Sequence, residues 1–192
     1  MMRRLPGLAC ALLLAACGNG APSDGVPVAA APPIKPAPAP ADPAQPARYD
    51  GYGDLRLGMD EAAFAKAWGG ELKGAPPSPG SSCKYKLPKW AKTPRDFAFM
   101  FEGGRFVRYD VGTAKEAAPG GGRVGMSLAQ VHALYGAAVD EQPHKYVEGA
   151  KILRVAAPQG GGVLVFETGA DGRVTRWRVG VPPQVDYVEG CG

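Results

Sequence analysis

The sequence contains an internal repeat, and this repeat constrains the fold more than any other feature. The string RLGMD, which begins at Arg56, recurs as RVGMS at Arg123. The string CKY at Cys83 then corresponds to HKY at His144, and GRFVRYDVG near the end of the first copy corresponds to GRVTRWRVG in the second. Three similar blocks in the same order are not expected by chance, so the sequence predicts a duplicated unit.

Each copy has the pattern of a short helix followed by antiparallel strands. Asp60 and Ser127 are typical N-cap residues, and Gly69 and Gly136 are typical of the position just beyond a helix. Alternating apolar and polar residues predict a hairpin late in each copy. The predicted strands are 97–102, 105–111, 163–167 and 173–179. We therefore expect an α+β fold of two tandem repeats, each a short helical segment followed by antiparallel strands, in one continuous domain.

The N-terminal region is predicted to direct the chain to a membrane. Arg3 and Arg4 precede an apolar run that is too short to span a bilayer, and this run ends in LAAC, which resembles the bacterial lipobox. The pattern predicts a lipoprotein signal peptide at residues 1–16 and a lipidated Cys17 that anchors the protein. An ordinary secretory signal cut after an alanine is the alternative. Gly18, where inner-membrane lipoproteins carry Asp, predicts the outer membrane, with the domain facing the periplasm.

Residues 17–47 are a predicted linker. The stretch 21–47 contains nine Pro and nine Ala, and such a composition cannot bury a core and favours extended polyproline conformations. The folded unit that follows is divided into a first module at 48–117 and a second module at 118–192.

Two cysteines belong to the folded unit, Cys83 and Cys191. In an oxidising periplasm such a pair predicts a disulfide that ties the C-terminus to the first module. Closing a loop of this length contributes about 4 to 5 kcal/mol in the chain-entropy model. Two free thiols are the alternative.

Residues for common chemistries are sparse in this sequence. A net charge of +4 without a polybasic run argues against a nucleic-acid partner, and no CxxC or HxxxH spacing is present for a metal site. No GxSxG occurs, the glycine runs lack the Lys-Ser/Thr of a phosphate loop, and His132 and His144 are predicted to be surface or boundary residues. The sequence fixes no separation for carboxylate pairs such as Glu102 and Glu167. We therefore expect no enzymatic activity, no cofactor and no metal site.

The last predicted strand of each module is the candidate binding element. Alternation places two sets of side chains on opposite faces of these strands. One set is Val107, Tyr109, Val111, Thr175, Trp177 and Val179; the other is Arg108, Asp110, Arg176 and Arg178. If helices cover the first set, with Tyr109 and Trp177 in the core, the second face is open and presents arginines, which are favoured at protein interfaces. A solvated sheet face is the alternative. Charge reversal at Arg176 and Arg178 is then expected to weaken partner binding and to leave thermal stability nearly unchanged.

The repeated motifs resemble a known architecture. The Arg-x-Gly-Met-[Ser/Asp] helix starts and the Gly-Arg-x-x-Arg-[Tyr/Trp] strands, over residues 52–180, resemble the β-lactamase inhibitory protein fold. They are also similar to single-module outer-membrane assembly lipoproteins of the SmpA/OmlA type. The resemblance implies a concave sheet that grips a partner protein. Inhibition of a β-lactamase is not carried over, because a disulfide within each module is lacking here.

A lipid-anchored periplasmic domain of this kind is also similar to the immunity lipoproteins of interbacterial toxin systems, including those that act against effectors delivered by type IV secretion. We therefore expect a protein-binding module that inhibits an enzyme or toxin effector. Two alternatives stay open. An envelope scaffold would bind the outer-membrane assembly machinery or peptidoglycan constitutively. A carbohydrate-binding module would stack sugars on aromatic side chains such as Trp90, Tyr187 or Tyr49.

Overall fold

The structure is a computed structural model that describes residues 45–74 and 76–191. The predicted signal peptide, the predicted lipidation site at Cys17 and all but the end of the predicted linker lie outside the described residues. Within the part of the chain that the structure describes, no helix has the length and apolar character needed to cross a membrane.

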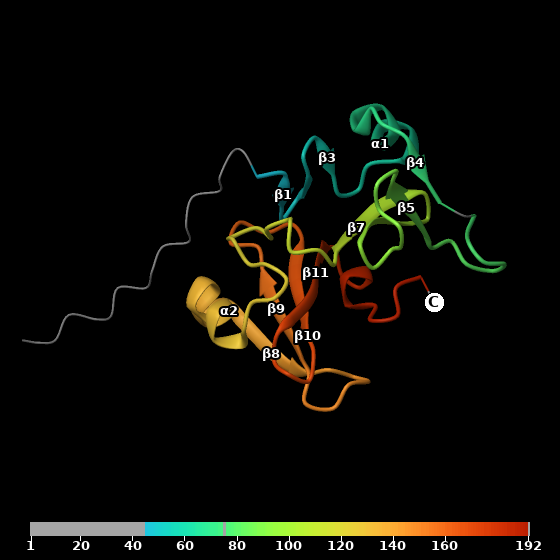
Figure 1. Cartoon of the computed structure of the whole chain (residues 1–192). Coiled ribbons are helices and arrows are strands. Elements are labelled where there is room, and N and C mark those ends of the chain that lie inside the picture. The colour runs from blue at the N-terminus through green and yellow to red at the C-terminus, as the bar shows by residue number, and fades with distance from the viewer. Residues whose placement is uncertain (1–44, 75, 192) are drawn as a thin grey trace, which may run out of the picture. The chain divides into compact units, whose positions relative to one another are not determined.

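An eight-stranded antiparallel sheet is the main element of the fold (Figure 1). Its strand order is β4-β5-β6-β7-β11-β10-β9-β8, so β7 and β11 meet in the middle while β4 and β8 form the edges. The strands are β4 (Leu72–Lys73), β5 (Lys84–Pro88), β6 (Phe97–Glu102), β7 (Arg105–Val111), β8 (Val139–Pro143), β9 (Lys151–Ala156), β10 (Val163–Thr168) and β11 (Val174–Gly180). The central pairing places Asp110 opposite Arg178.

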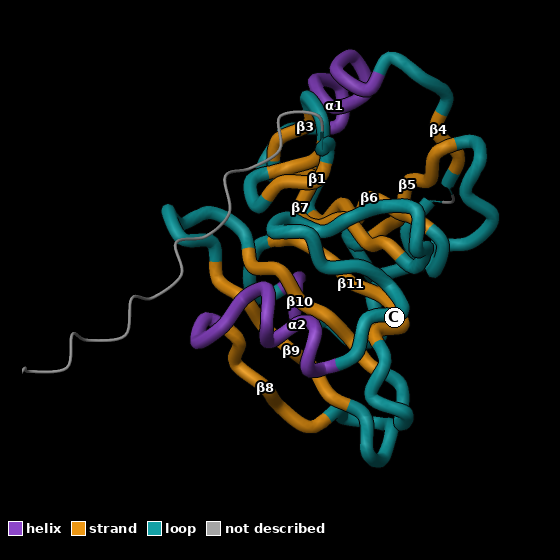
Figure 2. The backbone as a smooth tube through the Cα atoms, turned by 60° about the vertical axis from the view of Figure 1, so that its left-hand side comes forward, coloured by secondary structure: helices purple, strands orange, loops and turns teal. Residues whose placement is uncertain are grey.

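Two helices and a small second sheet accompany the large sheet (Figure 2). These elements are β1 (Ala47–Arg48), β2 (Gly51–Tyr52), β3 (Leu55–Arg56), α1 (Glu61–Trp68) and α2 (Leu128–Tyr135), together with the 3-10 turns η1 (Gly136–Ala138) and η2 (Gln184–Asp186). The predicted N-caps are confirmed. The Asp60 side chain accepts from the Ala63 amide, and Ser127 forms a capping box with Gln130.

Both helices pack against the same face of the large sheet, where the main core lies. Phe64 of α1 contacts Phe99, Phe101 and Phe106 edge to face, with ring centroids 4.9 to 5.0 Å apart. Helix α2 contributes Val131 to the same cluster, and this side chain is fully buried. Seven of the buried residues of this core are aromatic residues of the predicted strands: Phe97, Phe99, Phe101, Phe106, Tyr109, Phe166 and Trp177.

The predicted α+β fold of two tandem repeats is wrong. Among the described residues the fold is mainly β, with eleven strands and only two helices of eight residues each. Strands from both parts of the chain form one sheet through the pairing of β7 with β11, and the three short strands at the start form a second sheet. The sequence pattern missed these short strands and the pairing between distant segments. The predicted boundary between residues 117 and 118 lies in the connection between β7 and α2 and stays a prediction.

The repeated strings nevertheless mark equivalent local contacts. The Gly58 amide donates to the Phe106 carbonyl (2.7 Å), and the Gly125 amide donates to the Val174 carbonyl (2.8 Å). Both glycines have positive φ, 89° and 93°, a region that other residues enter at a cost. The Arg-x-Gly-Met string therefore encodes a tight turn that joins the segment before each helix to the start of β7 or β11.

Candidate binding face

The predicted arginine face is not open. We use "arginine face" for the side of the large sheet that carries Arg108, Asp110, Arg176 and Arg178. Relative exposure is 1% for Arg108, 5% for Asp110 and 1% for Arg178, and only Arg176 is half-buried. The cover is the C-terminal segment 181–191, here called the strap, which returns beside β7 and β11 (Figure 1). Burial removes these three side chains from direct contact with a partner while the strap is in place.

The core positions predicted on β7 and β11 need a second correction. Tyr109 and Trp177 are fully buried in the main core, as predicted. Met100 pairs with Arg108 and Phe101 pairs with Phe106, so the register skips Val107. Val107 consequently packs outside the main core, with Met100 and Cys83.

The same irregularity occurs on β11. Glu167 pairs with Arg176 and Thr168 pairs with Val174, so Thr175 is skipped and is exposed. An extra residue on one strand of an antiparallel pair breaks the alternation of faces, and strict alternation therefore misplaced one residue in each strand.

Arg108 joins the sheet to the strap. Its Nε donates to both Asp110 carboxylate oxygens, at 3.0 and 2.9 Å, and its Nη2 donates to Oδ1 at 2.6 Å. Its Nη1 donates to the carbonyls of Gln184 (2.9 Å) and Tyr187 (2.7 Å) in the strap. Burial works against the charge of Arg108, but the attraction of Asp110 outweighs this and raises the pKa of the guanidinium.

Glu167 holds the other two arginines. One of its carboxylate oxygens accepts from Arg178 and the other from Arg176. Burial alone would raise the pKa of Glu167, but the two guanidinium groups outweigh burial and lower it. Burial and the nearby charge of Arg108 lower the pKa of Arg178. Sequence reasoning assigned no role to Glu167, although its place opposite Arg176 in the predicted hairpin was an available signal.

Arg176 and Arg178 also bind the strap. Arg178 Nε donates to the Val185 carbonyl, and Arg176 Nη2 donates to the Val188 carbonyl at 3.0 Å. Val185 is fully buried between these contacts. The three arginines therefore hold the strap mainly by its backbone carbonyls.

Two further contacts fix the ends of the strap. Its start is bound to the sheet, because the Val181 amide donates to the Val107 carbonyl at 2.9 Å. The predicted disulfide between Cys83 and Cys191 is confirmed and closes its end. Next to the disulfide, Gly190 lies so close to the ring of Tyr85 that an added Cβ would be 2.4 Å from the Tyr85 hydroxyl. Burial, followed by the charge of Asp110, raises the pKa of Tyr85 to about 12.

Between β8 and β9, residues 144–150 form an exposed loop that we call the tip loop. Tyr146 and Val147 are 53% and 42% exposed, and the Lys145 ammonium lies 4.7 Å from the centre of the Tyr146 ring. His144 has a nearly buried side chain, and its Nδ1 accepts from the amides of Tyr146 (3.1 Å) and Val147 (3.2 Å). The histidine thus fixes the conformation that presents the two exposed side chains.

A groove of about 370 Å³ lies between the tip loop, the arginine face and the strap. It is lined by Gln142, Pro143, Lys145, Ile152, Arg154, Arg178, Asp186 and Val188. Arg154 in this groove forms a two-point ion pair with Asp186 of the strap, at 2.9 and 3.1 Å. The groove is therefore apolar in part and carries more basic than acidic side chains.

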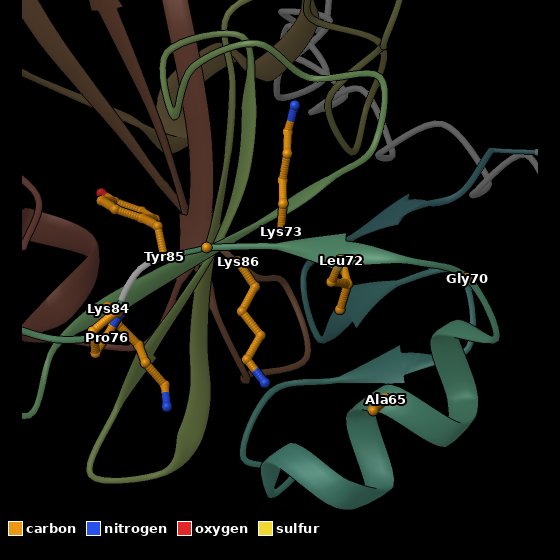
Figure 3. A pocket seen from close by; sticks show the side chains of 9 residues that line it. Ala65, Gly70, Leu72, Lys73, Pro76, Lys84, Tyr85 and Lys86 are labelled. Atoms are coloured by element: carbon orange, nitrogen blue, oxygen red, sulfur yellow. The ribbon is translucent and has the colours of Figure 1, made fainter.

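A second cleft of about 450 Å³ lies between α1 and strands β4 and β5 (Figure 3). Lys84 and Lys86 extend toward α1, where both bind Glu61 at 2.7 and 2.8 Å. These two lysines lower the pKa of Glu61.

Trp90, one of the predicted sugar-stacking residues, is 56% exposed, whereas Tyr49 and Tyr187 are half-buried. Within residues 45–74 and 76–191, no three His, Cys, Asp or Glu side chains are grouped to hold a metal ion.

Comparison with known proteins gives one weak structural likeness. No family model matches the chain, and no curated protein matches it. A solved structure of an extracellular protein containing an SCP domain, from Bacillus anthracis str. Ames, superimposes with a TM-score of 0.45 and 9% sequence identity. The match covers 66% of this chain and 44% of that protein.

Proposed function

We propose that the chain is a lipid-anchored, periplasm-facing outer-membrane protein that binds a protein partner and inhibits it. In this proposal the partner is an enzyme or a toxin effector, including one delivered by type IV secretion, and the chain acts as an immunity protein without enzymatic activity of its own. The single observation that carries the proposal is the tip loop, which presents Tyr146 and Val147 in a fixed conformation beside the groove.

The tip loop supports protein binding through the kind of side chain it exposes. Tyrosine and arginine are enriched among the residues that carry most of the binding energy at protein interfaces. Tyr146 lies at the surface while Arg154 lines the adjacent groove. A loop whose backbone is already ordered by His144 also loses less conformational entropy on binding. Because the arginine face is covered, we assign direct partner contact to the tip loop and to the exposed side chains of the groove. Arg178 lines the groove but is only 1% exposed, so we exclude it together with Arg108 and Asp110.

The proposal is tested with the full-length lipoprotein in its own cells. We expect affinity capture to recover one stoichiometric enzyme or toxin, and purified chain to block the activity of that protein. Tyr146→Ala should weaken this binding by about tenfold or more. Leu134→Ala is the matched control, because Leu134 is 47% exposed but lies on α2, and this change should leave the affinity unaltered.

Other outcomes of the same capture argue against the proposal. Recovery of outer-membrane assembly proteins, with an envelope defect on deletion, would establish the scaffold alternative. Binding of purified peptidoglycan that is lost in Trp90→Ala would establish the carbohydrate alternative. Equal affinity of the Tyr146→Ala variant for the recovered partner would remove the tip loop from the contact.

A further inference from the structure

The strap contacts the arginine face as a peptide ligand contacts a receptor. Four consecutive or nearly consecutive carbonyls, at residues 184, 185, 187 and 188, accept hydrogen bonds from arginine side chains of β7 and β11. Between Val181 and the disulfide, the backbone amides of the strap that donate to backbone carbonyls donate only to carbonyls within the strap. The amides of Val185 and Gly190 are examples. Apart from its two ends, the segment is therefore held by side chains of the sheet.

Three strap side chains supply the remaining contacts with this side of the sheet. Val185 is completely buried, Asp186 forms the ion pair with Arg154 of β9, and the side-chain amide of Gln184 donates to the Glu102 carboxylate of β6. Four of the contacts therefore use backbone carbonyls, which every polypeptide has. The side chains add an amide, an apolar group and a carboxylate at three successive positions.

The charge of the uncovered face indicates what it would bind. Arg108, Arg154, Arg176 and Arg178 carry four positive charges, whereas Asp110, Glu167 and Glu102 supply three carboxylates. One positive charge is thus in excess once Asp186 is withdrawn. A segment that covers these guanidinium groups must supply acceptors, because an unpaired buried charge is costly. The uncovered face would favour a segment that offers carbonyls and a carboxylate.

We propose that the arginine face is a binding site for an acidic polypeptide segment, and that the strap is its built-in occupant, locked in place by the Cys83–Cys191 disulfide. Reduction by a dithiol breaks the Cys83–Cys191 disulfide. The dithiol is oxidised to its own disulfide, and its two electrons and two protons convert the two cysteines to free thiols. The strap can then leave, and a segment with an apolar residue followed by Asp or Glu can take its place. This site goes beyond the protein-binding role of the tip loop.

The first test uses a full chain whose own strap can no longer compete. Cys191→Ser removes the lock and Val185→Asp spoils the buried strap side chain, while every residue of the arginine face is kept. The probe is a fluorescein-labelled peptide with the native sequence of residues 181–190. We expect saturable binding, at least tenfold tighter than that of the same peptide carrying Val185→Asp. Absence of saturable binding up to about 1 mM, or equal binding of the two peptides, overturns the proposal.

The test still gives a decisive result if this variant fails to fold. If the variant has lost its near-ultraviolet circular dichroism, the native peptide must restore that signal by completing the fold, and failure to restore it counts against the site. A peptide with Asp186→Asn should bind several-fold more weakly than the native peptide. Arg154→Ala in the chain should abolish this difference, because Arg154 is the partner of Asp186.

The lock is tested on the unaltered full chain by hydrogen exchange. On reduction with a dithiol, the amides of Val185 and Gly190 should exchange at least tenfold faster, while those of Phe106 and Val174 in the central strands keep their rates. Equal acceleration of strap and sheet amides, or no acceleration of the strap, would show that the strap is not a separable occupant. Neither test needs an external partner. Failure here leaves the proposed inhibitor role intact, and failure to find a partner leaves this site intact.

Discussion

The two halves of the large sheet, β4–β7 and β8–β11, satisfy buried arginines in different ways. In the first half, Arg108 is paired with Asp110, two residues further along the same strand. In the second half, Arg176 and Arg178 share Glu167 of the neighbouring strand. The register places Met100 of the first half where the second half has Glu167. This apolar-to-acidic difference gives the buried Arg178 and the half-buried Arg176 a shared carboxylate.

The halves also differ where the repeated strings place Cys83 and His144. Cys83 bonds covalently to Cys191 and closes the strap over the arginine face. His144 instead orders the tip loop through two hydrogen bonds. Equivalent positions therefore anchor different segments, the strap in one half and the proposed partner-binding loop in the other.

Charge reversal at the centre of the arginine face should strongly destabilise the fold through the second half of the sheet. Arg178→Glu would bury a second carboxylate beside Glu167 and remove the donor to the Val185 carbonyl, so we expect a loss of about 5 kcal/mol or more in the free energy of unfolding. This replaces the sequence-based expectation of nearly unchanged stability. Urea unfolding measures the effect. The control is Arg95→Glu, because Arg95 is exposed and this change should alter the free energy of unfolding by no more than about 0.5 kcal/mol. A small change in Arg178→Glu would contradict the structure.

Removal of the disulfide should have the next largest effect. The bridge spans a sequence separation of 108 residues, and we expect the Cys83→Ala/Cys191→Ala chain to lose about 4 to 5 kcal/mol of unfolding free energy. Guanidinium unfolding of this variant should match that of the wild-type chain under dithiol reductant. A loss below about 1 kcal/mol would mean that the arginine contacts alone fix the strap.

The two carboxylates of the arginine face should differ in importance. Glu167→Gln removes the hydrogen-bonded carboxylate from two guanidinium groups, whereas Asp110→Asn removes it from one. We expect losses of about 3 to 4 kcal/mol for Glu167→Gln and about 1 kcal/mol less for Asp110→Asn, both measured by chemical denaturation. The reverse order would contradict the view that the second half depends on one shared carboxylate.

Acid should weaken the fold through Glu167. Its pKa is lowered in the folded protein, so its contribution to stability is complete above the ordinary pKa of a glutamate. The contribution is lost as pH falls through the folded value, because the unfolded chain takes up the proton first. Denaturation between pH 7 and pH 3 should show this decline. Glu167→Gln should show a shallower decline, and identical slopes would exclude Glu167 as the source.

The exposed ion pairs on the helix side should contribute little in either half. Glu61 binds Lys84 and Lys86, and Glu141 binds His132 and Lys151, with each carboxylate about one-third exposed. We expect Glu61→Gln and Glu141→Gln to lose about 0.5 kcal/mol each, and less at high salt. A thermal melt at two salt concentrations measures both, and a loss near that of Glu167→Gln would overturn the distinction between buried and exposed pairs.

The features that local sequence determined are the ones found as predicted. Asp60 and Ser127 cap their helices because capping needs only residues within one turn. Tyr109 and Trp177 are in the core, and the disulfide partners are the only two cysteines of the predicted folded unit. Each of these conclusions depends on a residue type and its nearest neighbours in the sequence.

The tertiary structure alone decided the fold class, the cover over the arginines and the role of Glu167. Alternation predicted opposite faces correctly until a skipped residue at Val107 and at Thr175 shifted the register. Nothing within the strings of β7 and β11 reveals that the chain pairs these strands with each other or returns from Val181 to cover them. Pairing and burial between distant segments are set by the free energy of the whole packed chain, which no local pattern of residue types encodes.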